Sequence, residues 1–243
     1  MKLLDGKTAI VTGANRGIGK AIAETFRAHG ALVLACVRDP LADGFQDWAA
    51  AGGYVPIRLD LADADSIKEA VKAIRAQAPS VDILVNNAGL AHGGLFQMTS
   101  QADLRAVFEV NFFGPVALTQ ALSRVMARKK AGSIVNIAST AALIADPGTM
   151  AYGSSKAALI RATQSMAAEL GATGIRVNAI APGVTNTDMV AQMDAKAAQK
   201  LVEASALKRM AEPSDIADVA LFLASDLSRH VTGQVIRADG GIV

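Results

Sequence analysis

Three residues of this chain have side chains suited to proton transfer at a carbonyl oxygen: Ser139, Tyr152 and Lys156. A free phenol has a pKa of about 10 and is a poor acid or base at neutral pH, but a neighbouring cation lowers that pKa. Tyr152 and Lys156 have the spacing i and i+4, so in a helix both project from one face. Ser139, at the end of an apolar run, could hydrogen-bond a carbonyl oxygen that Tyr152 protonates. The pattern indicates carbonyl reduction, although a surface helix can carry Tyr and Lys at this spacing without any function.

The elements that must position these residues alternate along the chain. Short β-branched runs, each expected to form a strand, occupy residues 8–12, 32–37, 55–59, 83–86, 133–137, 176–181 and 234–238. Ala-rich amphipathic stretches, each expected to form a helix, occupy residues 18–28, 44–51, 66–77, 101–129, 152–171 and 214–225. Apolar strands separated by helices predict a parallel sheet covered on both faces. We therefore expect an α/β Rossmann fold with a doubly wound, parallel, seven-stranded sheet, as a single domain over residues 1–243.

Residues 184–207 interrupt this alternation. They follow Pro182-Gly183, are rich in Ala, Met, Gln and Lys, and have no strand pattern. A helix here would lie beyond the carboxyl end of the sixth strand, where open α/β sheets bind ligands. The segment is therefore a candidate substrate lid. The alternative is a helix that only packs on the domain.

The composition restricts the kinds of partner. The net charge is +2, and Arg128-Lys129-Lys130 is too short a basic cluster to follow a nucleic-acid backbone. No run of about 18 uncharged apolar residues is present, so we expect no membrane span. The three histidines are scattered, and the single cysteine, Cys36, lies inside an apolar run. We expect a cytoplasmic protein without a metal site or an intramolecular disulfide.

A glycine-rich turn joins the first expected strand to the first expected helix, and it reads Thr12-Gly13-Ala14-Asn15-Arg16-Gly17-Ile18-Gly19. Glycines there permit a tight turn and a close approach of the backbone to a ligand. The free N–H groups and the positive dipole of the helix N-terminus suit a pyrophosphate. The spacing differs from the Gly-x-Gly-x-x-Gly of other dinucleotide sites. Its position favours nucleotide binding over a purely structural turn.

The ordered set of motifs resembles the short-chain dehydrogenases/reductases over essentially all 243 residues. The motifs are the glycine turn, Asn86-Asn87-Ala88-Gly89, Asn111, Ser139, the Tyr152/Lys156 pair and Pro182-Gly183. Within that family the chain is most similar to the bacterial 3-oxoacyl-[acyl-carrier-protein] reductases. That similarity rests on Thr187-Asp188-Met189, on Leu223-Ala224-Ser225-Asp226 and on Thr232-Gly233-Gln234 with Asp239-Gly240-Gly241.

The resemblance implies a role for each motif. Tyr152 would be the general acid in reduction, Lys156 would lower its pKa, and Ser139 would orient the carbonyl. Asn111 would kink its helix and hold a water that links Lys156 to solvent. Residues implied to bind the cofactor are Gly13, Asn15, Arg16, Gly17, Ile18, Gly19, Arg38, Asp60, Leu61, Asn87, Ala88, Gly89, Tyr152, Lys156, Pro182, Gly183, Val184 and Thr187.

The choice between NAD and NADP depends on the end of the second strand. NAD-selective sites carry a carboxylate there, which accepts from the ribose 2′-OH and would repel a 2′-phosphate. Here Val37 takes that place, Arg38 follows, and Arg16 lies in the glycine turn. Two guanidiniums suit a phosphate dianion, whereas Asp39 argues the other way. We expect NADP(H), with the alternative that both arginines are ordinary solvated charges.

Three functions fit the sequence. The first is reduction of a 3-oxoacyl thioester, and the second is reduction of a sugar, steroid or other small ketone. The third is a non-catalytic NADP-binding module, which the presence of Asn111, Ser139, Tyr152 and Lys156 disfavours. The substrate is thus a small carbonyl or alcohol compound, free or bound to a carrier.

Recognition of an acidic carrier protein would need basic side chains near the site entrance. Arg128-Lys129-Lys130 could supply them, but Thr173 stands where carrier-dependent relatives often have a basic residue. His92 could lie at the substrate mouth or be an ordinary loop residue. Met150, Met189 and Met193 could line an apolar pocket or fill the core. By resemblance we also expect a homotetramer.

Overall fold

The computed structural model describes residues 2–190 and 195–242 and shows a seven-stranded sheet with every neighbouring pair of strands parallel. The strand order is β3-β2-β1-β4-β5-β6-β7. The strands are β1 (Thr8–Thr12), β2 (Leu32–Val37), β3 (Val55–Arg58), β4 (Ile83–Asn86), β5 (Gly132–Ile137), β6 (Ile175–Pro182) and β7 (Val235–Ala238). The chain winds outward from β1 in both directions. The order therefore reverses between β1 and β4, where such sheets bind ligands at the carboxyl ends of the strands.

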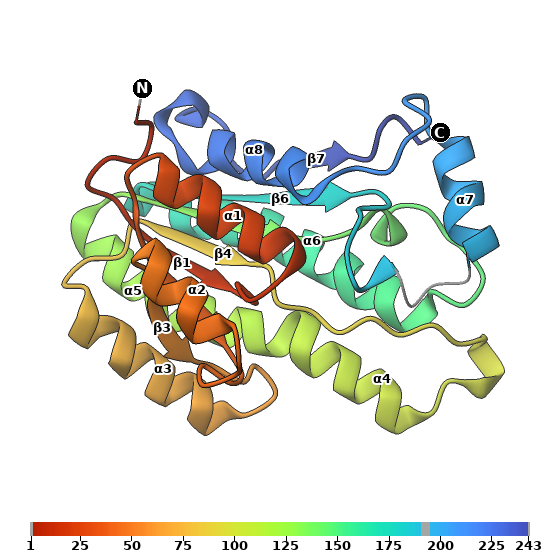
Figure 1. The fold of residues 1–243 in the computed structure, drawn as a ribbon, viewed down its shortest axis with the longest axis horizontal. Helices are drawn as coiled ribbons and strands as arrows, with labels where there is room; N and C mark the ends of the chain where they lie inside the picture. Colours follow the sequence, from red (N-terminus) through yellow and green to blue (C-terminus); the bar gives the residue numbers. More distant parts are fainter. Residues whose placement is uncertain (1, 191–194, 243) are drawn as a thin grey trace.

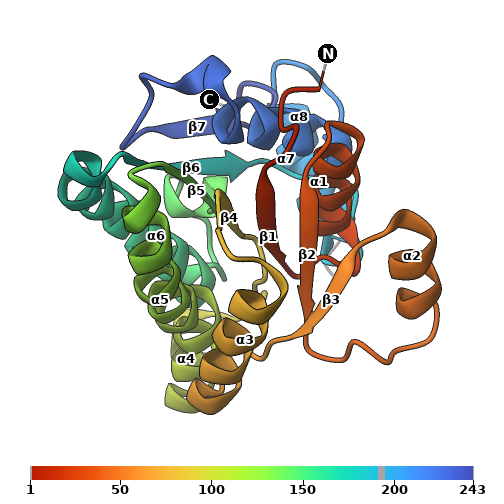
Figure 2. The same ribbon diagram turned by 90° about the vertical axis from the view of Figure 1, so that its left-hand side faces the viewer.

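Helices cover both faces of the sheet (Figures 1 and 2). One face carries α1 (Gly17–Ala28) and α8 (Pro213–Ala224), and the other carries α3 (Ala64–Gln77), α5 (Gly114–Lys129) and α6 (Met150–Leu170). The remaining helices are α2 (Phe45–Gly52), α4 (Gln101–Phe108) and α7 (Ala195–Ala204). Short 3-10 turns span Phe96–Met98, Thr140–Ala142, Gly171–Thr173 and Asp226–Ser228. The predicted fold class is confirmed.

The period-two alternation of each central strand divides the core into two layers. In β1, Val11 packs toward α1 and α8, while Ile10 packs toward α3, α5 and α6. In β4, Val85 and Leu84 repeat the division. Both faces of these strands are apolar because both are covered, which is why the strands read as continuous hydrophobic runs.

Among the residues that the structure describes, no helix is both long enough and apolar enough to cross a bilayer.

The helix expected over residues 101–129 is interrupted. A π-helical turn, Glu109–Phe113, separates α4 from α5. Pro115 opens α5 and has no N–H to donate, so the regular ladder stops there. Gly114 lies against the loop after β3, since an added Cβ would come within 2.4 Å of the Leu61 carbonyl oxygen. The prediction of one continuous α-helix is wrong, and the break contains Asn111, where the resemblance implied a kink. Single π turns often mark functional sites.

The segment that interrupts the alternation contains a helix, as expected. Helix α7 lies beyond the carboxyl end of β6, and Thr185 forms a parallel bridge with Ala211 (Figure 1). The predicted segment 184–207 also includes residues 191–194, among them Met193, which lie outside the described residues.

Candidate active site

Ser139 and Tyr152 come together through the turn that follows β5. Ser139 caps the 3-10 turn Thr140–Ala142, and its Oγ accepts a hydrogen bond from the Ala141 N–H at 3.1 Å. Helix α6 lies directly on this turn, because a Cβ at Gly153 would come within 2.5 Å of the Ala141 carbonyl oxygen. Gly153 thus permits the close packing that brings Tyr152 to Ser139. Sequence inspection overlooked it, although a glycine in a helix interior was a signal.

Lys156 is buried beneath this pair. Its side chain is 3% exposed, and its Nζ donates to the Ile137 carbonyl oxygen at 2.8 Å. Nζ lies 5.9 Å from the centroid of the Tyr152 ring. Burial disfavours the ammonium form and lowers the pKa of Lys156 to about 8. The predicted one-face arrangement of the two side chains is confirmed.

The Tyr152 hydroxyl keeps its proton at neutral pH. Burial raises the pKa of Tyr152 above its ordinary value, and the hydrogen bond with Ser139 acts in the opposite direction without outweighing it. The sequence predicts that Lys156 lowers this pKa. That prediction is wrong in its net direction, because Lys156 is directed at a backbone carbonyl and the phenol is desolvated.

Asn111 lies in the π turn and is completely buried. Its Oδ1 accepts from the Leu90 N–H at 2.7 Å, and its Nδ2 donates to the Leu90 carbonyl oxygen and to Ser155 Oγ, both at 3.0 Å. Ser155 Oγ in turn donates to the Tyr152 carbonyl oxygen at 2.7 Å. Asn111 therefore ties the loop after β4 to the backbone of the tyrosine. Sequence inspection overlooked Ser155, which is fully buried one position before Lys156.

The glycine turn is braced from β4. Thr12 Oγ1 accepts from the N–H groups of Asn87 and Ala88, both at 2.9 Å. The Asn87 amide donates to the carbonyl oxygens of Thr12 and Gly13 at 2.8 and 3.3 Å. An added Cβ at Gly19 would lie 2.2 Å from the Gly13 carbonyl oxygen. The structure therefore places Asn87 and Ala88 first of all as supports of the turn.

Three predicted cofactor residues are glycines at close approaches. Gly13 and Gly17 have positive φ, +67° and +52°, where other residues are strained. A Cβ at Gly89 would lie 3.2 Å from Asn111 Oδ1 and 3.4 Å from Lys156 Nζ, so a side chain here would crowd both groups. The bare turn at the N-terminus of α1 and the open corner at Lys156 form a cradle of the kind that a dinucleotide needs.

The second group of predicted cofactor residues lies around this cradle. Asp60 Oδ1 accepts from the Ala62 N–H, and the Leu61 side chain is buried in the core. Arg38 is exposed directly after β2, and Asn15 and Arg16 are exposed in the glycine turn ahead of Ile18. Asp39, the residue that argues for NAD, uses its Oδ1 to accept from the Leu41 N–H in its own turn.

The third group follows β6. Pro182 ends the strand, and Gly183 packs against Asp239, where a Cβ would lie 2.8 Å from the Asp239 Cα. The Val184 carbonyl oxygen accepts from the Ala211 N–H. Thr187 Oγ1 donates to the Thr185 carbonyl oxygen at 3.2 Å, and its methyl group faces Gly17. The structure thus brings the β6 end and the glycine turn into contact.

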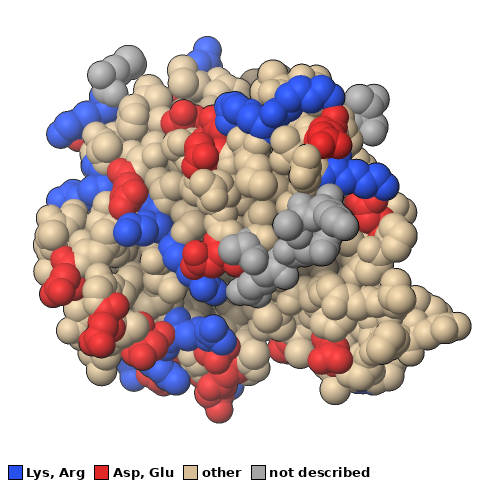
Figure 3. Space-filling view, turned by 45° about the vertical axis from the view of Figure 1, so that its right-hand side comes forward, with Lys and Arg blue, Asp and Glu red and all other residues tan. Residues whose placement is uncertain are grey.

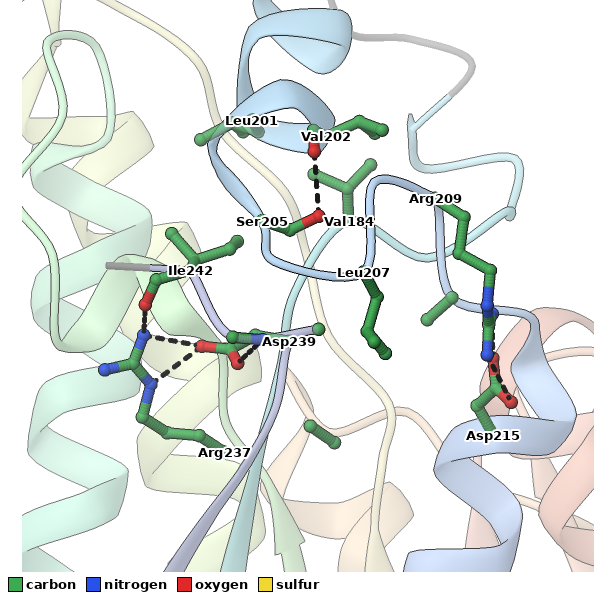
Figure 4. Close-up of a pocket in the computed structure, with 14 residues that line it drawn as sticks. Val184, Leu201, Val202, Ser205, Leu207, Arg209, Asp215, Arg237, Asp239 and Ile242 are labelled. Carbon is green, nitrogen blue, oxygen red and sulfur yellow. Dashed lines mark hydrogen bonds and ion pairs between the residues drawn. The ribbon is translucent and has the colours of Figure 1, made fainter.

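A separate cavity of about 280 Å³ lies beside Val184, between α7 and the residues after β7 (Figure 4). Its charged side chains are paired internally: Arg209 with Asp215, and Arg237 with Asp239, each at 2.6 Å. Neither Ser139 nor Tyr152 lines it. The cavity lies at the base of α7 and is separate from the corner formed by Ser139, Tyr152 and Lys156.

Several exposed apolar side chains are close in sequence to the predicted site residues. Leu90, Leu143 and Met189 are between 39% and 46% exposed, and each lies within four residues of a predicted site residue. Leu95, Phe96 and Met98 are more exposed still and lie in the 3-10 turn that precedes α4 or at its N-cap. Figure 3 shows that the molecule has a projecting lobe whose tip is almost free of charged side chains. Met150, which the sequence suggested either for an apolar pocket or for the core, is the first residue of α6.

The structure locates the basic cluster Arg128-Lys129-Lys130 and His92, which the sequence suggested for the site entrance. Lys129 pairs with Asp82 at 2.6 Å, next to the first residue of β4, so Arg128-Lys129-Lys130 lies at the amino edge of the sheet, opposite the catalytic corner. The suggestion that it flanks the entrance is wrong within this chain, because α5 runs from one edge to the other. His92 lies in the loop before α4, with Nε2 3.9 Å from Asp103.

A doubly wound sheet with a glycine turn and a Ser-Tyr-Lys corner is typical of a nicotinamide-dependent oxidoreductase. A family model described as "Enoyl-(Acyl carrier protein) reductase" matches residues 13–243. The chain belongs to the short-chain dehydrogenase/reductase family.

Relatives in this family differ in what their names say they act on. The 3-oxoacyl-[acyl-carrier-protein] reductase FabG of Thermotoga maritima is 39% identical, with 99% of each chain covered. A 7α-hydroxysteroid dehydrogenase structure with NADH and a 7-oxo bile acid has a TM-score of 0.93 and 36% identity over 99% of this chain and 95% of that one. A structure named as an NAD(P)-dependent gluconate 5-dehydrogenase from Beutenbergia cavernae, with NADP at low occupancy, has a TM-score of 0.91 and 35% identity. The match covers 98% of this chain and 96% of that one.

Proposed function

We propose that this protein reduces a ketone to a secondary alcohol with NADPH, and that its substrate is a 3-oxoacyl thioester. The observation that carries the proposal is the corner formed by Ser139, Tyr152 and Lys156 at the carboxyl edge of the sheet, with Asn111 behind it. The similarity to 3-oxoacyl-[acyl-carrier-protein] reductases over nearly the whole chain supports this substrate class.

The chain's own residues would act on the substrate oxygen. Ser139 would hydrogen-bond it, and Tyr152 would donate its proton as negative charge develops there. A phenol whose pKa is raised by burial is protonated at neutral pH and therefore ready to act as an acid. Lys156 would add positive charge beneath the oxygen, and the Asn111–Ser155 chain would hold the tyrosine backbone in place.

NADPH, when bound, supplies the hydride. Gly13, Gly17 and Gly19 would accommodate its pyrophosphate at the N-terminus of α1. Lys156 would hold the ribose on the nicotinamide side, and Val184 and Thr187 the carboxamide. Structural relatives contain either NADH or NADP, so the preference for NADPH is argued from the residues of this chain. Val37 carries no charge at the end of β2, and the exposed side chains of Arg16 and Arg38 would bind a 2′-phosphate.

The apolar approach favours an acyl chain over a sugar. Leu90, Leu143 and Met189 would offer an uncharged surface to it. The name of the matching family model refers to reduction of a carbon–carbon double bond, whereas a Ser-Tyr hydroxyl pair is suited to protonating oxygen. A steroid or another apolar ketone is the second candidate. We further infer that residues 1–243 form one domain, that α7 covers the substrate, and that the protein is a homotetramer.

A panel of substrates tests the proposal. Acetoacetyl thioester, crotonyl thioester, a steroid ketone and a sugar ketone are each offered with NADPH and with NADH. We expect turnover of the acetoacetyl thioester, with kcat/KM about 10- to 100-fold higher with NADPH, since each charge-assisted hydrogen bond to phosphate contributes about 1.5–3 kcal/mol. Turnover of crotonyl thioester alone would replace ketone reduction with enoyl reduction. Turnover confined to the other ketones would remove the thioester assignment.

A further inference from the structure

Arg16 in the glycine turn is paired with a carboxylate that lies far away in sequence. Its Nη1 is 3.2 Å from Asp188 Oδ2, across 172 positions of the chain. The Thr187 side chain reaches the same turn, because its Cγ2 would lie 3.1 Å from a Cβ on Gly17. The guanidinium assigned to the 2′-phosphate thus already has an anionic partner, supplied by the segment after β6.

The strength of this pair determines what it can do. Its side chains are 63% and 67% exposed, so it contributes on the order of 0.2–1 kcal/mol. Both partners accept charge-assisted hydrogen bonds from Arg16, but a phosphate carries a charge of about −1.5 to −2 and three acceptor oxygens, against a single charge on Asp188. The phosphate would therefore displace the carboxylate, and the ion pair would reduce the affinity for NADPH without preventing its binding.

We propose that Asp188 is a further determinant of cofactor choice, which competes with the 2′-phosphate of NADPH for Arg16. The inference rests on the proposed NADPH preference. NADH has a 2′-hydroxyl and does not need Arg16, so Asp188 affects the binding of one cofactor and not the other. Among residues 2–190 and 195–242, Asp188 is the one carboxylate in an ion pair with Arg16. Asp188 belongs to the candidate lid segment 184–207, so this segment would also lower the affinity of Arg16 for the 2′-phosphate.

A double-mutant cycle tests this. Dissociation constants for NADPH and NADH are measured by titration for the wild type, Asp188→Asn, Arg16→Gln and the double variant. We expect Asp188→Asn to tighten NADPH binding by about 1.5- to 5-fold, the equivalent of an exposed ion pair, and to leave NADH unchanged. In the Arg16→Gln background the same substitution should have no effect. The gain should shrink at 0.5 M salt.

The matched control is Asp226→Asn, which changes the net charge equally but lies at the amino edge of the sheet, where the residue is exposed. It should leave both constants unchanged. Equal tightening of NADPH and NADH by Asp188→Asn, or tightening that persists in the Arg16→Gln background, would overturn the inference. If Arg16→Gln leaves NADPH binding unchanged, Arg16 does not bind the 2′-phosphate and the inference fails, whereas the NADPH preference itself is judged by the ratio of the NADPH and NADH constants of the wild type. If only the Asp188 arm is silent, the preference stands and Asp188 has no part in it.

Discussion

The Lys156 ammonium donates a 2.8 Å hydrogen bond to the carbonyl oxygen of Ile137, the last residue of β5. Ser139 lies two residues beyond Ile137, so this bond fixes α6 to the strand end that carries the serine. The lysine is therefore both a buried charge and a mechanical link between the two halves of the catalytic corner. The predictions on pH and on stability follow from that double role.

The pH dependence of kcat for reduction should follow the protonation of Lys156. Its pKa is lowered to about 8, so the cation is lost as the pH rises through that value, while the raised pKa of Tyr152 keeps the phenol protonated. We expect kcat for reduction to be constant from pH 6 to 7 and to fall above about pH 8. The kcat–pH profile checks this, and Lys156→Arg, which stays charged, should remove the alkaline limb from whatever activity remains. A wild-type profile that is flat to pH 10 would disagree.

Lys156→Met should stabilise the fold at neutral pH while removing turnover. A pKa lowered from 10.5 to about 8 means that burial of the cation costs on the order of 3 kcal/mol, and loss of the bond to Ile137 leaves a buried carbonyl at a cost of about 1 kcal/mol. We expect a gain of about 2 kcal/mol in the unfolding free energy at pH 7, measured with denaturant.

The pH dependence of that gain provides the control. The unfolded chain binds more protons at Lys156 than the folded chain between about pH 8 and 10.5, so the wild type gains stability from this residue as the pH rises through that window. The advantage of Lys156→Met should therefore shrink from pH 8 upward and change sign between about pH 9.5 and 10, where the cost of the buried cation has fallen to about 1 kcal/mol. A constant difference between the two proteins would show that the ammonium is not the source of the cost.

Gly19→Ala should collapse the dinucleotide turn. The added methyl group would lie 2.2 Å from the Gly13 carbonyl oxygen and 2.4 Å from the Asn87 amide nitrogen, so the braced turn must shift. We expect destabilisation of about 1–3 kcal/mol and at least about tenfold weaker NADPH binding, measured by thermal unfolding and by titration.

Gly171→Ala is the matched substitution. Its Cβ would meet nothing within 4 Å, and its φ of −55° is one that alanine adopts readily. It should be neutral or stabilise by up to about 1 kcal/mol without affecting NADPH binding. Similar effects of the two substitutions would argue against a special role for the Gly19 approach.

The sequence predicted the strands well because each central strand is apolar on both faces, a local pattern that survives folding. It placed Tyr152 and Lys156 correctly for the same reason, since helical spacing is local. It failed where distant segments decide the outcome. The resemblance implied a kink at Asn111, but not the bonds that this residue makes with Leu90, 21 positions earlier, and the direction of the Tyr152 pKa depends on how much surrounds the phenol.

Two supporting residues went unnoticed for a related reason. Gly153 and Ser155 are small and carry no chemistry of their own, so only the packing of α6 on the Ser139 turn and the bond from Asn111 reveal what they do. The basic cluster Arg128-Lys129-Lys130 shows the reverse case. Its composition suggested a docking surface, and the direction of α5 places it at the opposite edge of the sheet.

The central claim is that the Tyr152 hydroxyl delivers a proton to the substrate oxygen. The direct measurement is single-turnover reduction of acetoacetyl thioester by Tyr152→Phe at saturating NADPH, with NADPH affinity determined on the same preparation. Loss of the one hydroxyl should lower the rate by about 10²- to 10⁴-fold and leave the NADPH dissociation constant within about twofold, because the ring and its packing remain. A rate within tenfold of the wild type, with NADPH still bound, would contradict the account.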